Sequence, residues 1–485
     1  MATLSPQVRF GTLLAEELHP APDPWHVARQ LANQPNLLFL DSALRSASLG
    51  RYSFVAADPF AWMDSRGTLV SEGWPGCISL TYEADPFAVL TDWLSRYRQD
   101  TVPGLPPFQG GAAGLFGYEL GQHLERIPRA AIDDFEIPEL ALGFYDWVVA
   151  FDHVADRAWI LSTGWPEQEP EARQRRARSR LKRVRQLLDR PLPPVPGPMS
   201  WHAVPATLHP LPDHPRVSSC FTPSQFQEAI RAAIEYVHAG DCFQVNLAQR
   251  LLTPWREPPL SLYQRLRERN PAPFAGYFEM GAVSIVSASP ERFLRLRQGE
   301  VETRPIKGTR PRGKTADEDA DRARELLGSE KDRAENVMIV DLLRNDLGRV
   351  CRFGSVQVEA VCRLESYPTV HHLVSDVRGT LRPGLGAIDL LRAAFPGGSI
   401  TGAPKVRAME IIAELEPVVR GPYCGSLGYL SFDGAMDTSI LIRTFTTAGG
   451  WAQFPVGGGI VADSRPEIEY AETLHKAAGL LRSLA

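Results

Sequence analysis

The stretch Arg304-Pro305-Ile306-Lys307-Gly308-Thr309 sets a lysine between a Pro-Ile pair and a Gly-Thr pair. Pro305 fixes one backbone torsion, and Gly308 permits close backbone approach or an unusual conformation. Such flanking residues hold one side chain at a fixed point beside a ligand. A turn that carries a surface lysine is the alternative, and it would be preferred if the stretch stood alone. However, Glu291 in Ser-Pro-Glu-Arg-Phe (289–293) begins the same segment and could face Lys307 as its proton partner.

This segment resembles the chorismate-utilising enzymes. That family comprises anthranilate synthase component I, aminodeoxychorismate synthase component I, and the isochorismate and salicylate synthases. Anthranilate synthases usually carry Pro-Ile-Ala-Gly-Thr at this place. Aminodeoxychorismate synthases carry Pro-Ile-Lys-Gly-Thr, with the lysine as a covalent nucleophile, and residues 305–309 have this second form. The resemblance therefore implies an enzyme of the aminodeoxychorismate synthase type, with Lys307 and Glu291 as catalytic residues.

Composition places the chain among soluble globular proteins. Its 485 residues are 44% hydrophobic and 22% charged, and the net charge of −5 gives no general case for binding nucleic acid or membranes. No apolar run approaches the roughly 18 residues of a membrane helix, and the N-terminus does not resemble a signal peptide. The six cysteines have no Cys-x-x-Cys spacing, which suits a reducing compartment. We therefore expect a cytoplasmic protein.

The order of strand and helix signals predicts three regions. Residues 1–165 are rich in strand patterns, residues 166–219 hold a charged helix and a proline-rich linker, and residues 220–485 form the catalytic, chorismate-binding domain. Hairpin patterns with helices between them predict an α+β fold with large antiparallel sheets and flanking helices, as in anthranilate synthase component I. Residues 438–446 are predicted as one strand, and Ser464 as the cap of the last helix. The apolar face predicted for that helix comprises Ala471, Leu474, Ala478 and Leu481.

Two predicted helices each carry a pair of acids three residues apart, and therefore on one face. The pairs are Asp332 with Glu335, and Glu469 with Glu472. Taken alone, either pair is more often a solvated surface. Both positions match the magnesium-binding acids of the family, so the resemblance implies Mg²⁺ at Glu335 and Glu472, with Glu469 close by. Mg²⁺ takes hard oxygen ligands and keeps several waters, which suits a bridge to the substrate carboxylate.

Further residues are assigned to chorismate by the same resemblance. His372 matches a family active-site histidine, although a lone histidine would otherwise be interpreted as structural. Arg443 lies within an apolar run, so its guanidinium needs a partner. The two oxygens of a substrate carboxylate match the geometry of this guanidinium. Gln244 replaces the lysine that activates water in isochorismate and salicylate synthases, which favours transfer of an amino group. The other substrate-binding residues implied are Gly308, Thr309, Tyr423, Gly457, Gly458 and Gly459, of which the last three could also be a flexible turn.

A second site is suggested by a weaker local match. In relatives, the corresponding residues form a tryptophan pocket, which is regulatory in anthranilate synthases and can be structural in aminodeoxychorismate synthases. Serine, arginine and proline are also ordinary loop residues. The matching positions are Ser42, Arg51, Tyr52, Ser53, Pro271, Ala272 and Pro273.

The reaction implied is the conversion of chorismate and ammonia to 4-amino-4-deoxychorismate, on the route to 4-aminobenzoate and folate. The chain has no Gly-x-Cys-x-Gly nucleophile turn, so we expect ammonia from a separate glutamine amidotransferase subunit. Two alternatives remain. One is anthranilate synthase component I, which a product assay would separate. The other is a non-catalytic paralogue that binds chorismate or tryptophan and regulates a partner.

Overall fold

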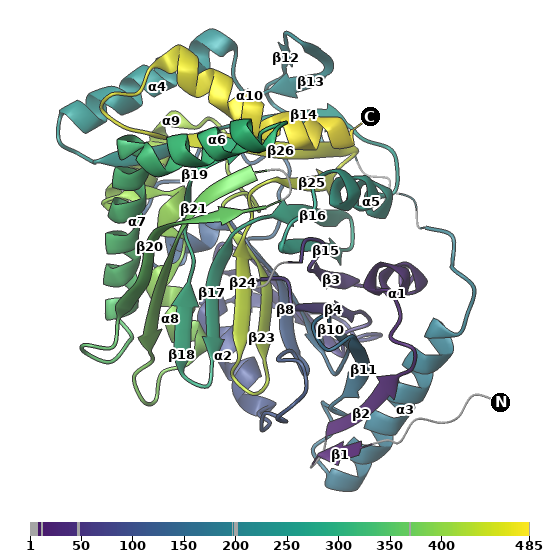
Figure 1. The fold of residues 1–485 in the computed structure, drawn as a ribbon. Coiled ribbons are helices and arrows are strands. Elements are labelled where there is room, and N and C mark those ends of the chain that lie inside the picture. The colour runs from purple at the N-terminus through teal and green to yellow at the C-terminus, as the bar shows by residue number, and fades with distance from the viewer. Residues whose placement is uncertain are drawn as a thin grey trace.

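The computed structural model describes residues 8–10, 13–45, 49–195, 197, 202–367 and 370–484. Strands in this part of the chain form two large antiparallel sheets, with helices around them (Figure 1). The α+β fold with large antiparallel sheets and flanking helices is therefore confirmed. None of the described helices has the length and apolar character needed to cross a membrane.

Sheet A contains the following strands in spatial order: β1 (Val8–Phe10), β2 (Leu13–Leu18), β11 (Arg157–Ser162), β10 (Trp147–Asp152), β4 (Tyr52–Ala56), β3 (Leu38–Asp41), β15 (Phe274–Met280), β16 (Val283–Ser289), β25 (Thr444–Ala448), β26 (Trp451–Ile460), β14 (Gln244–Pro254), β13 (His214–Ser219) and β12 (His209–Leu211), with β22 (Gly402–Ala403) beside β14.

Sheet B is ordered β19 (Ile306–Pro311), β21 (Val370–Thr380), β18 (Glu300–Thr303), β17 (Arg292–Arg297), β24 (Met436–Ile440), β23 (Ser426–Ser431), β8 (Gly111–Phe116), β9 (Leu140–Tyr145), β5 (Ala61–Arg66), β6 (Leu69–Gly73) and β7 (Leu80–Glu83), with β20 (Gln357–Ser366) beside β21.

The helices are α1 (Pro24–Gln30), α2 (Pro86–Arg96), η1 (Tyr118–His123), α3 (Pro170–Leu188), α4 (Pro223–His238), α5 (Pro259–Arg269), α6 (Ala316–Gly328), α7 (Glu330–Gly348), α8 (Ala387–Ala394), η2 (Gly398–Ile400), α9 (Lys405–Leu415) and α10 (Pro466–Ser483).

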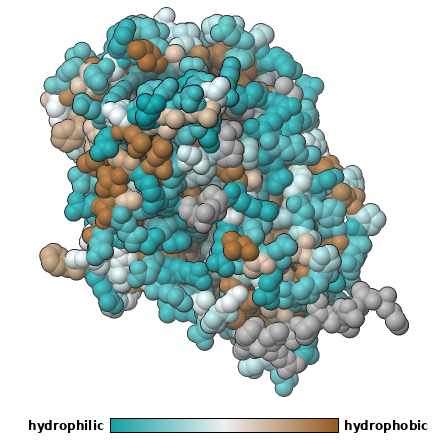
Figure 2. All heavy atoms as spheres, in the orientation of Figure 1, coloured by the Kyte–Doolittle hydropathy of each residue, from teal (hydrophilic) through white to brown (hydrophobic). Residues whose placement is uncertain are grey.

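Three apolar cores hold these layers together. One lies between the two sheets, where Phe54 and Phe278 of sheet A meet Leu115 and Tyr429 of sheet B. One of the other two lies between sheet A and α1, α3, α5 and α10. The other lies between sheet B and α2, α7 and α8, and it extends to α4 and α9, which pack on β14 of sheet A. Outside these cores, the face in Figure 2 is mostly hydrophilic, and its hydrophobic side chains form small separate groups.

Both sheets contain strands from either side of the proline-rich segment. In sheet B, β8 pairs with β23, and in sheet A, β3 pairs with β15. The division into residues 1–165, 166–219 and 220–485 stays a prediction about the sequence, because the sheets themselves join the first and last regions. The arginine-rich helix α3 packs on sheet A, and its Arg180 bonds to Asp146 and Asp58 of the same chain.

Two of the points at which the chain crosses from one sheet to the other are neighbours in space. Pro290 and Glu291 join β16 of sheet A to β17 of sheet B, and residues 441–443 join β24 of sheet B to β25 of sheet A. The prediction of one strand over residues 438–446 is therefore wrong. Arg443, the last residue before β25, has φ of 53°, a left-handed conformation that interrupts the extended backbone in spite of the surrounding apolar pattern. Backbone hydrogen bonds tie the crossings together, since Ile440 N donates to Glu291 O and Ala288 N donates to Arg443 O, both at 3.1 Å.

The C-terminal helix begins differently from its prediction. Proline occupies the first turn of α10, where its missing N–H would have no partner in any case. Ser464 does not cap the helix. Its hydroxyl donates instead to Glu469 Oε1 at 2.7 Å, and it accepts the N–H of Val461. The buried face is also shifted from the predicted one, and comprises Glu469, Thr473, Ala477, Gly479, Leu480 and Ser483. Glu469 is thus turned inward, toward β26.

Candidate active site

Lys307 lies on β19, at the edge of sheet B, beside a β-bulge. In the pairing with β21, Lys307 is opposite Leu373 and Thr309 is opposite His372, so Gly308 is the extra residue. Its φ of 80° is unfavourable for residues with a side chain, and an added Cβ would lie 3.0 Å from Asp332 on α7. Glycine at this position therefore permits the bulge, which re-aims the neighbouring side chains.

Glu291 lies at the first sheet crossing and is 5% exposed. Ser399 Oγ, on η2, donates to its Oε1 at 2.7 Å. Burial raises the pKa of Glu291 to about 7, although Ser399 and the charge of Lys307 both favour the ionised form. A carboxyl group with this pKa can both give and take a proton near neutral pH.

Lys307 is half-buried, and burial lowers the pKa of its amine. The charges of Glu335, Glu291 and Glu472 oppose that shift, while the charge of Lys476 adds to it. No carboxylate in the described ranges lies within ion-pair distance of Lys307 Nζ. The structure therefore brings the predicted nucleophile together with the predicted proton partner and two of the predicted metal-binding acids.

A second group of predicted residues lies around His372 on β21. Thr309 Oγ1 and His372 Nδ1 are 2.8 Å apart, and the ring is 6% exposed. Burial, and then the charge of Arg443, lower the pKa of His372 to about 4, so the ring is neutral at pH 7. Burial also lowers the pKa of Arg443, and its strongest opposing influence is Tyr423. No described acidic side chain forms a salt bridge with Arg443, which leaves its guanidinium available for an anion.

The predicted metal-binding acids lie on two helices. Glu335 is half-buried on α7, and burial raises its pKa. Glu469 and Glu472 lie on α10, and a Cβ placed on Gly458 would be 3.6 Å from Glu469 Oε2 and 3.9 Å from Glu472 Oε1. Carboxylate oxygens of this kind fit Mg²⁺, which needs few protein ligands. No cluster of three or more His, Cys, Asp or Glu with the arrangement of a metal site occurs among the described residues.

Two lysines take part in this acidic group and were not identified from sequence. Lys476 Nζ lies 2.7 Å from Glu472 Oε1 and donates to Gly457 O at 2.9 Å. Lys331 Nζ lies 3.7 Å from Glu469 Oε1. The spacing of four between Glu472 and Lys476 on one helix is a signal that would have found the first pair. Ser399 was missed because no spacing in sequence relates it to Glu291.

The three predicted glycines lie in β26 and not in a turn. They pair with β14, Gly459 opposite Asn246 and Gly457 opposite Ala248. A Cβ on Gly459 would lie 2.7 Å from the side chain of Gln244. Gln244 is fully buried, and both polar atoms of its amide lack a hydrogen-bond partner in the described part of the chain. A buried amide left unpaired beside glycine backbone indicates a polar ligand at this place.

The residues predicted to bind tryptophan are only partly brought together. Ser42, Arg51, Tyr52 and Pro273 line a cavity of about 260 Å³ between the two sheets. Arg51 is already paired with Asp152 at 2.7 Å. The remaining three do not line the cavity: Ser53, Pro271 and Ala272. Whether tryptophan occupies this cavity stays a prediction.

Comparison with known proteins identifies the family of this chain. The family model described as "chorismate binding enzyme" matches residues 59–482, which is most of the chain. The chain belongs to the chorismate binding enzymes. This assignment confirms the family resemblance that was based on residues 289–309.

Several members of the chorismate binding family are close in sequence. The chain is 42% identical over 459 residues to aminodeoxychorismate synthase component 1 of Klebsiella aerogenes, which covers 94% of this chain and 95% of that protein. The Escherichia coli (strain K12) protein of the same name is also 42% identical, over 94% of each. Anthranilate synthase component 1 of Thermus thermophilus is 46% identical over 382 residues, 79% of each chain.

Solved structures of this family share the fold. Anthranilate synthase component I from Streptococcus pneumoniae aligns with a TM-score of 0.74 at 32% identity, covering 90% of this chain and 93% of that one. MenF, an isochorismate synthase from Escherichia coli, aligns with a TM-score of 0.70 at 19% identity, covering 98% and 94%. The predicted anthranilate synthase component I-like fold is thus confirmed.

Proposed function

We propose that this chain is an aminodeoxychorismate synthase component I, which converts chorismate and ammonia to 4-amino-4-deoxychorismate. The observation that carries the proposal is that Lys307 and Glu291 lie close enough for the charge of each to affect the pKa of the other, without forming an ion pair. Burial moves the two pKa values in opposite directions, the amine downward and the carboxyl upward to about 7. Such a pair can exchange protons with a substrate near pH 7. The relatives named aminodeoxychorismate synthase component 1 support the same activity.

The mechanism begins with Lys307 as an uncharged amine. Its nitrogen forms a bond to C2 of the ring, both conjugated ring double bonds shift, and the C4 hydroxyl leaves as water with a proton from Glu291. Ammonia then forms a bond to C4, both double bonds shift back, and the bond from Lys307 to C2 breaks, which returns Lys307 as an uncharged amine. Glu291 takes one proton from the incoming nitrogen, which returns the acid to its starting state.

The other residues hold the substrate in position. Arg443 has no acidic partner among the described residues, so it can bind a substrate carboxylate. Neutral His372, fixed by Thr309, donates or accepts a hydrogen bond without adding charge. The paired glycines of β26 allow the ring to approach the backbone beside Gln244.

Mg²⁺ is part of the proposal, and Glu335 and Glu472 would hold it, with Glu469 nearby. When bound, the ion would supply positive charge that orients the ring carboxylate of chorismate. Lys331 and Lys476 now neutralise part of the acidic group. These two lysines must therefore share or yield the carboxylates when the ion binds.

Ammonia is proposed to come from a separate glutamine amidotransferase subunit, because the chain carries no glutaminase nucleophile turn. Tryptophan is proposed as the occupant of the cavity lined by Ser42, Arg51 and Tyr52. Calorimetry with tryptophan tests whether this amino acid binds in the cavity. Absence of heat at millimolar concentration would remove tryptophan from this cavity.

The deciding experiment is chromatography of the product formed from chorismate, ammonium and Mg²⁺. We expect 4-amino-4-deoxychorismate from the wild-type chain and none from Glu291→Gln. Anthranilate synthase component I is the second candidate, because the Thermus thermophilus relative of that name is 46% identical. Anthranilate as the main product would establish this second candidate and refute the first.

A further inference from the structure

One face of sheet A ends in a row of polar side chains. The register pairs Glu279 of β15 with Ser284 of β16, and Ser284 with Thr447 of β25. Directly opposite residues on neighbouring strands point to the same face of a sheet, so these three side chains lie in one row. Further along the same face, Tyr277 and Phe445 belong to the apolar core beneath α5. The row is therefore the polar end of an otherwise apolar surface.

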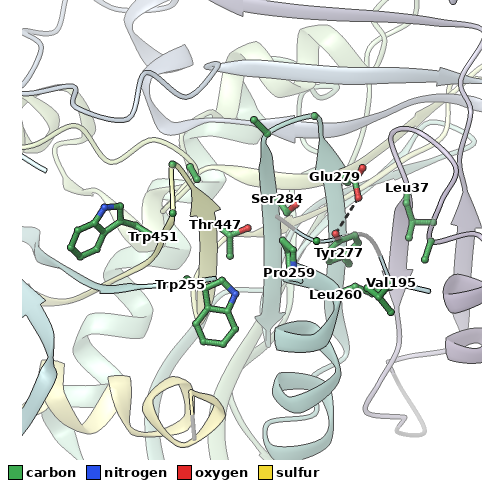
Figure 3. Close-up of a pocket in the computed structure, with 17 residues that line it drawn as sticks. Leu37, Val195, Trp255, Pro259, Leu260, Tyr277, Glu279, Ser284, Thr447 and Trp451 are labelled. Carbon is green, nitrogen blue, oxygen red and sulfur yellow. Dashed lines mark hydrogen bonds between the residues drawn. The ribbon is translucent and has the colours of Figure 1, made fainter. Parts of the chain in front are cut away.

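A cavity of about 240 Å³ lies over this row. Figure 3 shows Ser284 and Thr447 between the Tyr277–Glu279 pair on one side and two tryptophans on the other. The apolar parts of its wall come from Leu37, Trp255, Leu260, Tyr277 and Trp451. This combination of aromatic walls and a few polar groups is typical of sites for small organic molecules.

Two buried polar atoms at this cavity have no partner in the described part of the chain. Trp255 is 7% exposed and its indole Nε1 makes no hydrogen bond. Thr447 is 5% exposed and its Oγ1 makes none either. The second tryptophan differs, because Trp451 Nε1 donates to Ala203 O at 3.1 Å. Buried polar groups are normally paired, so two unpaired atoms at one cavity indicate an occupant that completes them.

The charge at the cavity comes from Glu279. Its carboxylate is half-buried and accepts a hydrogen bond from the Tyr277 hydroxyl at 3.4 Å. It forms no salt bridge with a described basic residue. Arg265 pairs with Glu257 at 2.8 Å, and its guanidinium lies over the Trp255 ring, 5.3 Å from the ring centroid. Burial raises the pKa of Glu279, which shows that its charge is poorly solvated. A cation is the natural partner of this buried and unpaired carboxylate.

We propose that this cavity binds a small aryl-alkyl ammonium ion. The ammonium group donates to Glu279 and to Thr447 Oγ1, and the ring packs against Trp255 and Leu260. An acceptor atom on the ligand ring, at the end away from the ammonium group, accepts a hydrogen bond from Nε1 of Trp255. The site is separate from the active site, because Ser284 lies at the opposite end of β16 from the crossing that carries Glu291.

Calorimetry of the full chain with three probes tests each group in turn. Tyramine carries both the ammonium and a ring hydroxyl, phenethylamine lacks the hydroxyl, and 4-ethylphenol lacks the charge. We expect saturable binding of tyramine with Kd of about 1 mM or below. Phenethylamine should bind several-fold more weakly, and 4-ethylphenol should not bind measurably.

Variants assign the contacts. Glu279→Gln should weaken tyramine binding by about tenfold, because it removes the charge and keeps the shape. Thr447→Val should weaken both amines several-fold. Trp255→Phe should abolish the difference between tyramine and phenethylamine. Glu268→Gln, the same change at an exposed position on α5, is the matched control and should leave binding unchanged.

Three results would overturn the proposal. One is no saturable heat with any probe at millimolar concentration. Another is binding of 4-ethylphenol as tight as that of tyramine. The third is unchanged tyramine affinity in both Glu279→Gln and Thr447→Val, with thermal unfolding showing that the variants are folded.

Discussion

At the scale of single residues, the proposed chemistry depends on two side chains whose burial shifts their pKa values in opposite directions. Lys307 and Glu291 come from different places in the fold, a bulge at the edge of sheet B and a crossing between the sheets. Each could be identified from its local motif. Their electrostatic coupling could not, because it depends on how deeply each is buried.

Lys307→Ala tests the covalent step. With chorismate present and ammonia excluded, a fraction of the wild-type chain should carry an added mass on the peptide containing Lys307. The alanine variant should lose this adduct and slow strongly, and any remaining product should shift toward the 2-amino isomer. Mass spectrometry and product chromatography measure both effects. Formation of 4-amino-4-deoxychorismate by Lys307→Ala at the wild-type rate, with no adduct ever trapped, would show that the lysine is only an electrostatic contact.

Ser399 should set the proton affinity of Glu291. Its hydroxyl donates to the carboxylate, which favours the ionised form. Removing the donor in Ser399→Ala should therefore raise the pKa of Glu291, by about one unit for a hydrogen bond to a charged group. The limb of the kcat/KM profile that falls as pH increases should move to higher pH.

Ser399→Thr is the control for that experiment, because it keeps a hydroxyl at the same place. It should restore the wild-type profile. An unshifted profile in Ser399→Ala, with kcat merely reduced, would assign Ser399 to packing.

At the scale of elements, the bulge in β19 and the helices α7 and α10 shape the site. Both helices were predicted from sequence, although the cap predicted for α10 at Ser464 is wrong. The inward face of α10 was predicted less well: it buries Thr473, Ala477 and Leu480, each one position before a residue of the predicted apolar stripe, together with Glu469. That stripe was misleading because the helix packs the carboxylate of Glu469 against Gly458 of β26.

Gly308→Ala should distort the bulge. The added Cβ meets both a left-handed φ of 80° and Asp332 at 3.0 Å. We expect loss of about 1–2 kcal/mol of stability from the backbone strain, together with a strong loss of kcat. Gly434→Ala is the matched control, with φ of 85° and no atom within 4 Å of the added Cβ. It should show the same strain in thermal unfolding but retain activity. Equal activity in Gly308→Ala and Gly434→Ala would show that catalysis does not depend on the bulge in β19.

Glu335→Gln tests the metal proposal across the two helices. Mg²⁺ binding by calorimetry should weaken by at least about tenfold, and so should chorismate binding in the presence of Mg²⁺. Glu330→Gln, an exposed position on the same helix, is the control and should bind as the wild type does. Mg²⁺ affinity that is the same in wild type and Glu335→Gln would remove Glu335 as a ligand.

At the scale of the whole molecule, the hairpin patterns predicted antiparallel sheets, and the two sheets of the structure confirm them. The pairing of β8 with β23 and of β3 with β15 could not be predicted, because the residue pattern of a strand does not indicate which other strand it pairs with. For the same reason, the active site could be assembled from sequence only through the family resemblance. The cavity over Glu279, Ser284 and Thr447 was not predicted, because these three residues are brought side by side only by the register of three paired strands.

The dependence on a partner is a prediction for the whole chain. The purified protein should aminate chorismate with ammonium salts and not with glutamine. Addition of a glutamine amidotransferase subunit should restore the use of glutamine. Glutamine-dependent turnover by the purified chain alone would mean that it contains an ammonia-releasing site of its own.

The sharing of both sheets by distant parts of the chain also affects how the protein folds. Gln244 on β14 is held beside Gly459 on β26, more than two hundred residues later, and β8 closes against β23 across an even longer loop. Contacts of such high sequence separation form late, because the loop entropy must be lost before they stabilise anything. In refolding from denaturant, helix content should therefore recover first. Enzymatic activity should recover last, at the rate of the slowest refolding phase.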